Sequence, residues 1–104
     1  MREPLGKIIA WEYLSDNRYP DPLFERDFAI GPVQFDLFCE KLRLVISISG
    51  RELSFRERKE RAKLIAYFDL CHFTIESEEI VECIDALLLR IDVFRGIGER
   101  KRAL

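Results

Sequence analysis

Apolar and polar positions recur with two different periods along the chain. Polar and apolar side chains alternate over residues 24–30, 33–39 and 42–49, and residues 68–75 are apolar at most positions. Alternation is typical of strands, and an apolar run rich in β-forming residues is typical of a strand covered on both faces. The pattern predicts four strands. The first three are joined in antiparallel order through Gly31-Pro32 and a tight turn at Glu40-Lys41.

Three other segments have helical spacing. Residues 4–14 begin with Pro4, which suits a first helical turn, and Ser54 with Glu57 three positions later forms a capping box at the start of residues 55–66. A third helix is expected to begin at Ser77, which would cap it. The predicted apolar face of the first helix comprises Leu5, Ile8, Ile9, Trp11 and Leu14. The predicted apolar face of the last helix comprises Ile80, Ile84, Leu87, Leu88 and Ile91.

These elements follow one another in the order α-β-β-β-α-β-α. A helix between the third and fourth strands favours a parallel pair, so we expect an α/β fold with a mixed central sheet flanked by helices. A chain of 104 residues has room for one hydrophobic core. We therefore predict one domain over residues 1–95 and a basic C-terminal tail over residues 96–104, with Arg100, Lys101 and Arg102.

Composition and charge restrict the classes of function. The formal net charge is -2 and the pI is about 5.5, so any site for a polyanion has to be a local patch. No apolar run approaches the length of a membrane span, and a cytoplasmic protein is expected. Cys39, Cys71 and Cys83 are widely spaced and His72 is the only histidine, which argues against a zinc site and predicts buried free thiols.

Three segments, taken together, resemble a known family. Residues 30–39 resemble a strand pair with a conserved aspartate, residues 44–50 resemble a strand of the form LxIExDG, and residues 61–74 resemble a helix-strand unit of the form RDxxLxxxGFxVxRFT. In this order they resemble the restriction-endonuclease-like PD-(D/E)XK superfamily, and in particular its small branch similar to the very short patch repair endonucleases. The resemblance covers most of the chain and implies a restriction-endonuclease-like core.

The resemblance also implies where an active site would lie. In that family, carboxylates from adjacent strands hold a divalent metal, usually magnesium, which polarises the scissile phosphate and activates a water molecule. Asp36 matches the first carboxylate, whereas Ser47 and Ser49 stand at the positions of the other two. Two hydroxyls in place of two anions leave Asp36 as a weak metal ligand at best.

Two further departures concern Gly6 and His72. Gly6 stands where the family's first helix often carries a glutamate, and His72 stands where the family usually has arginine. A serine nucleophile at Ser47 or Ser49 would need His72 as its base, and the spacing specifies no third group to orient the imidazole. We expect a catalytically inactive nuclease fold that needs no cofactor, with magnesium required only if some activity survives.

Two kinds of non-catalytic function remain open. The helix over residues 55–66 carries the basic side chains Arg56, Arg58, Lys59, Arg61 and Lys63, which suit a phosphate backbone of DNA or RNA. The other possibility is a protein-interaction module that binds a partner or a second copy of the chain. The alternative to both is a residual metal-dependent DNA endonuclease that uses Asp36, unless this carboxylate is structural and caps an amide or pairs with Arg43.

Overall fold

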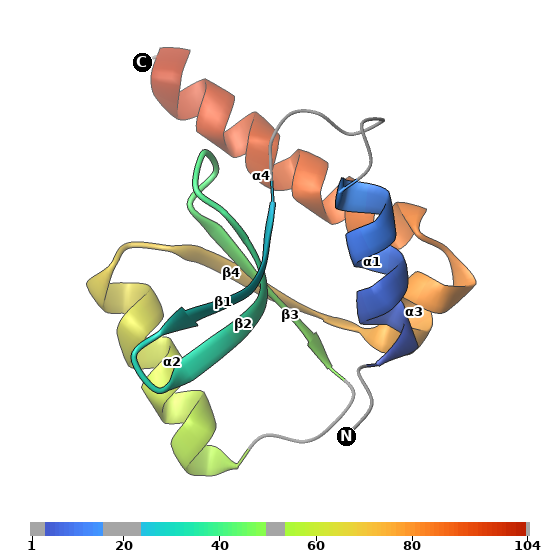
Figure 1. The fold of residues 1–104 in the computed structure, drawn as a ribbon. Helices are drawn as coiled ribbons and strands as arrows, with labels where there is room; N and C mark the ends of the chain where they lie inside the picture. The colour runs from blue at the N-terminus through green and yellow to red at the C-terminus, as the bar shows by residue number, and fades with distance from the viewer. Residues whose placement is uncertain (1–3, 16–23, 50–53, 104) are drawn as a thin grey trace.

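Four strands form one mixed sheet in the computed structural model of the chain, which describes residues 4–15, 24–49 and 54–103, with side chains as far as Gly96 (Figure 1). The strands are β1 (Glu25–Ile30), β2 (Val33–Cys39), β3 (Leu44–Ser49) and β4 (Cys71–Glu76). They are hydrogen-bonded in the order β1-β2-β3-β4. β1 with β2 and β2 with β3 are antiparallel, whereas β3 with β4 is parallel. The predicted meander and the predicted parallel pair are confirmed.

The helices are α1 (Leu5–Ser15), α2 (Phe55–Tyr67), α3 (Ser77–Glu82) and α4 (Asp85–Ala103). The element order is therefore α-β-β-β-α-β-α-α, which confirms the α/β class and adds one helix to the predicted order. The more specific restriction-endonuclease-like arrangement stays a prediction. No helix in the described part of the chain is both long enough and apolar enough to cross a membrane.

The sheet separates two hydrophobic clusters. The larger cluster joins α1, α3 and α4 to one face of the sheet through residues such as Ala10, Ile46 and Leu87. The smaller cluster lies on the other face, where Leu64 and Ile65 of α2 pack against Phe35, Val45 and Val33. Figure 1 shows α2 apart from the other three helices. The side of the sheet covered by α2 alone is consequently the less buried one, and no residue of α2 is fully buried.

β2 changes face at Asp36. Val33 and Phe35 belong to the cluster under α2, whereas Leu37 and Cys39 belong to the cluster on the opposite face. Strict alternation would place all four on one face, as the sequence predicted. In the β1–β2 register, the pair Arg26–Leu37 is followed by the pair Phe28–Phe35. Asp27, between them on β1, has a φ of 54° and is not paired in the register. The prediction was wrong because the ladder is interrupted where Asp27 and Asp36 face each other.

The helix predicted to begin at Ser77 is divided into two. Cys83 has extended backbone angles and ends α3, and its carbonyl accepts the first amide hydrogen bond of α4, from Ala86. The break allows α3 to pack beside α1 while α4 crosses the sheet, which one straight helix could not do (Figure 1). Ser77 does not cap α3, because its Oγ accepts a hydrogen bond of 2.8 Å from the amide of Gly6 in α1.

The buried face of α1 differs from the predicted one. Gly6, Lys7, Ala10 and Leu14 are buried, whereas Leu5 and Ile8 are exposed. Hydrophobicity alone predicted a face centred on the large apolar residues. The actual face contains small residues because α1 approaches α3 closely at Gly6, and it contains Lys7 because that side chain forms ion pairs under the helix.

Turns account for the remaining differences from the predicted boundaries. Residues 40–43 form the connection between β2 and β3, with Arg43 at a φ of 50°, so β3 begins two residues later than predicted. Gly31, with a φ of 57°, is the first residue of the two-residue β1–β2 turn, a position that favours glycine.

The free thiols differ in burial, since Cys39 is buried as predicted but Cys83 is exposed. The backbone of α4 continues to Ala103, through most of the predicted tail.

Candidate functional site

Ser47 lies at the centre of a polar cluster between the sheet and α2. Arg61 of α2 donates from Nη1 to Ser47 Oγ at 2.5 Å and from Nη2 to the carbonyl of Gln34 at 2.8 Å. His72 on the parallel strand β4 places Nε2 3.0 Å from the same Ser47 Oγ. The register explains the meeting, because Val45 pairs with His72 and Ser47 pairs with Thr74 on the adjacent strand.

Phe35 forms the apolar floor of this cluster. The guanidinium carbon of Arg61 lies 5.2 Å from the centre of the Phe35 ring, and the His72 ring meets the same ring edge-on at 6.0 Å. Burial, and secondly the positive charge of Arg61, lower the pKa of His72 below its ordinary value of 6.5. In the neutral tautomer with the proton on Nδ1, Nε2 accepts a hydrogen bond from the Ser47 hydroxyl, while Oγ accepts from the guanidinium of Arg61.

The Ser47–His72 contact has the distance of a nucleophile and its base, yet it lacks the rest of such a site. Ser47 is 6% exposed, so a substrate has little access to its hydroxyl. Among the described residues, no carboxylate is bonded to the other ring nitrogen of His72. A serine nucleophile relies on such a group to hold the imidazole in the correct tautomer. The geometry is therefore that of a buried hydrogen-bonded cluster that holds α2 on the sheet.

Asp36 belongs to a second polar cluster, which involves α1 rather than α2. Its Oδ2 accepts a hydrogen bond of 2.6 Å from the amide of Ile48, beyond the last registered β2–β3 pair. Its Oδ1 lies 3.2 Å from Nζ of Lys7. The carboxylate thus replaces a backbone acceptor where β2 and β3 separate. Arg43, the predicted cross-hairpin partner, instead donates to the carbonyl of Phe68.

Lys7 joins two carboxylates at the interruption of the β1–β2 ladder. Its ammonium also forms a short ion pair with Asp27 Oδ1, and Arg26 donates to Asp27 Oδ2 at 3.0 Å. The hydrogen bond with Lys7 lowers the pKa of Asp27 more than partial burial raises it. Burial opposes the charged form of Lys7, but the bond to Asp27 and the attraction of Asp36 offset it, so the pKa of Lys7 is raised above 10.5.

The donor set around these positions does not fit a divalent metal. Both oxygens of Asp36 already accept from a donor, one of them from the cationic Lys7, and the Ser47 hydroxyl faces the cationic Arg61. Magnesium needs several anionic or neutral oxygen ligands that are free of competing cations. In the described ranges, no group of three or more His, Cys, Asp or Glu side chains is placed to hold a metal ion.

Ser49 was the third position predicted from the family pattern. Its Oγ is buried and has no hydrogen-bond partner among the residues that the structure describes. Residues 50–53, which follow it directly, lie outside the described ranges. Ser47 and Asp36 therefore take part in two separate networks, and the described contacts do not join Ser49 to either.

The basic residues of α2 divide into two groups. Arg61 is half-buried and its guanidinium is engaged with Ser47 and Phe35. Arg56, Arg58, Lys59 and Lys63 are exposed. The predicted tail residues Arg100, Lys101 and Arg102 lie beyond the described side chains, in the last turns of α4. Four of the five predicted nucleic-acid-binding residues of α2 are thus available to a ligand.

Sequence reasoning missed Lys7 and Asp27. The available signal for Lys7 was a lysine among apolar neighbours, between Gly6 and Ile8, where a solvated charge is out of place. The signal for Asp27 was weaker, because an aspartate on the polar side of an alternating strand is ordinary. Only the folded structure shows that the ammonium of Lys7 in α1 reaches carboxylates of both β1 and β2.

Comparisons with known proteins add no further assignment. No protein-family model matches the chain, and no curated protein matches it. The resemblance to the restriction-endonuclease-like superfamily therefore rests on the order and content of the sequence motifs and stays a prediction.

Proposed function

We propose that this chain is a nucleic-acid-binding module with a restriction-endonuclease-like fold that does not cleave its ligand. The observation that carries the proposal is the outward face of α2. Arg56, Lys59 and Lys63 are exposed there, while Arg61 points inward. We call these three residues the α2 basic stripe.

Helical geometry places the stripe on one side of α2. Residues three, four and seven positions apart lie on the same face of a helix. Arg56, Lys59 and Lys63 have this spacing, and their face lies opposite Ile65, which packs on the sheet. Glu60 beside the stripe is half-buried and offsets part of its charge. The stripe therefore presents cations to solvent at intervals suited to phosphate contacts.

The two internal polar clusters support the non-catalytic part of the proposal. A nuclease of the resembled family needs free carboxylates to hold its metal. Here Lys7 neutralises Asp36, and Arg61 directs its charge at Ser47. Cations belonging to the protein occupy the places where a metal would be needed. On this proposal, they restrict the fold to binding.

We expect the binding to depend steeply on salt. Three phosphate contacts on a duplex predict a slope of about -3 in a plot of log K against log salt concentration. Lys59→Ala/Lys63→Ala should reduce the slope by about two and weaken binding by about tenfold or more at low salt. Fluorescence anisotropy of a labelled oligonucleotide, titrated at several salt concentrations, measures both quantities.

The matched control is Arg95→Ala, which removes a cation from α4. Arg95 pairs with Asp92, and α4 covers the opposite face of the sheet from α2. We expect this variant to bind as the wild type does. Absence of binding at low salt, or an equal loss in the control, would refute the proposal and favour a protein-interaction module.

A further inference from the structure

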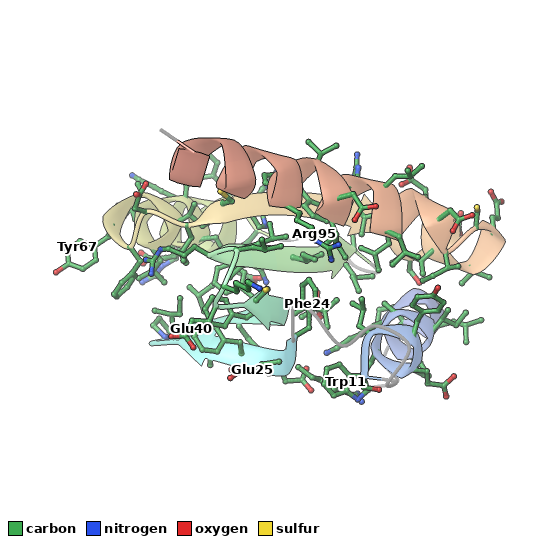
Figure 2. All side chains as sticks on the ribbon, turned by 90° about the horizontal axis from the view of Figure 1, so that it is seen from above. Trp11, Phe24, Glu25, Glu40, Tyr67 and Arg95 are labelled. Atoms are coloured by element: carbon green, nitrogen blue, oxygen red, sulfur yellow. The ribbon has the colours of Figure 1, made fainter. Side chains whose placement is uncertain are left out.

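Two aromatic side chains are exposed where α2 ends. Tyr67 is 82% exposed and Phe68 is 41% exposed. Their rings meet edge to face, with centroids 4.9 Å apart and planes at 80°. Figure 2 shows Tyr67 directed away from the body of the molecule. Exposure of this degree leaves most of the Tyr67 ring without a protein neighbour.

The aromatic pair is held in place by the fold. Phe68 ends α2, and its amide donates to the carbonyl of Leu64 at 3.0 Å. Arg43, from the β2–β3 turn, donates to the carbonyl of Phe68. This contact ties the end of the helix to the β2–β3 turn. Tyr67 is therefore presented from a secured position rather than from a free end.

Tyr67 continues the α2 basic stripe. It follows Lys63 by four positions, so the two side chains are neighbours on the same face of the helix. From Arg56 to Tyr67 the stripe extends about 16 Å along the helix axis at 1.5 Å per residue. Phe55, at the other end of α2, is also exposed, at 77%. This side of α2 thus has cations in its middle and an exposed aromatic ring near each end, groups that suit the phosphates and the bases of one strand.

We propose that this surface binds unpaired nucleotides, with a base stacked on Tyr67 and the phosphates on one side of that base on Lys63 and Lys59. The proposal rests on the proposed function and specifies its ligand. In a duplex both faces of each base are covered by neighbouring base pairs, so an exposed ring gains little from it. In a single strand every base offers a free face, and stacking on an aromatic side chain is favourable whatever the sequence.

The experiment compares two probes and two kinds of variant. The probes are a labelled oligothymidylate of about twelve nucleotides and a duplex of the same length. This length lies within the range of site sizes of proteins that bind single strands. We expect tighter binding of the single strand. Tyr67→Leu should weaken single-strand binding by about tenfold while leaving duplex binding nearly unchanged. Tyr67→Phe should retain single-strand binding, because stacking needs the ring and not the hydroxyl.

A control variant, Tyr13→Ala, removes a partly exposed tyrosine of α1 on the other side of the sheet and should bind as the wild type does. Equal affinity for both probes, or full retention of single-strand binding in Tyr67→Leu, would overturn this inference and leave the proposed function standing. Failure of the wild type to bind either probe would overturn both.

Discussion

Lys7→Met should destabilise the fold by about 2–3 kcal/mol, because it removes the cation between two carboxylates that remain in place. The Lys7 side chain is only 9% exposed, and Asp27 and Asp36 would be left to repel each other at the interrupted ladder. The expected loss is below that of a fully buried pair, since the Asp27 and Asp36 side chains are 37% and 24% exposed. Urea denaturation followed by circular dichroism measures it.

The acid dependence of stability provides a second readout of the same ion pairs. The folded-state pKa of Asp27 is lowered, chiefly by its bond with Lys7. The stabilisation from this pair is therefore present above the unfolded pKa of about 4 and is lost as the pH falls through the lower folded value. Lys7→Met should flatten this part of the stability profile.

Lys59→Met is the matched control, because Lys59 is exposed on α2. It should change the free energy of unfolding by no more than about 0.5 kcal/mol. An unchanged stability in Lys7→Met, with the acid profile of the wild type, would contradict the assignment of Lys7 as the internal counterion of Asp27 and Asp36.

Gly6→Ala should be the most destabilising small substitution in α1. A Cβ at this position would lie 2.5 Å from the Ser77 carbonyl oxygen and 2.7 Å from its Cα, both of which are backbone atoms. α1 and α3 would have to separate, which weakens the Gly6 N–Ser77 Oγ bond as well as the packing. We expect a loss of about 2–3 kcal/mol, a lowering of the melting temperature by roughly 10–20 °C.

The same substitution at Gly96 supplies the control. Gly96 lies within α4, and nothing lies within 4 Å of a Cβ built there. Alanine in a helix is favoured over glycine by about 0.5–1 kcal/mol, so Gly96→Ala should be neutral or stabilising. If Gly6→Ala behaved like Gly96→Ala in differential scanning calorimetry, the close approach of α1 and α3 would be disproved.

The strands were predictable because the residue pattern that identifies a strand lies within the segment itself. Alternation over residues 33–39 and the β-forming residues of 44–49 identify strands without knowledge of their neighbours, and the helix before residues 71–76 makes a parallel partner economical. The break at Cys83 was not predictable from periodicity. The apolar spacing from Ile80 to Ile91 suits a continuous helix, and the helix divides because its two parts pack on different surfaces.

Only part of the membership of the candidate site was predictable, since Lys7 and Asp27 were missed. The motif pattern drew attention to Asp36 and Ser47, and the structure gives each of them definite partners. Those partners, Lys7 and Arg61, come from helices on opposite faces of the sheet. No periodicity reveals such contacts, since they depend on side-chain reach between elements distant in sequence. A fold also does not determine a function, so the ligand has to be inferred from the exposed residues of α2.

Incubation of the protein with supercoiled plasmid and magnesium or manganese tests the central claim most directly. At low salt, we expect the plasmid to be retarded in a native gel and to remain supercoiled after the protein is removed. Asp36→Asn, which keeps the shape of the side chain, should give the same result. Nicking or linearisation by the wild type that disappears in Asp36→Asn would contradict the claim that internal cations have replaced the metal.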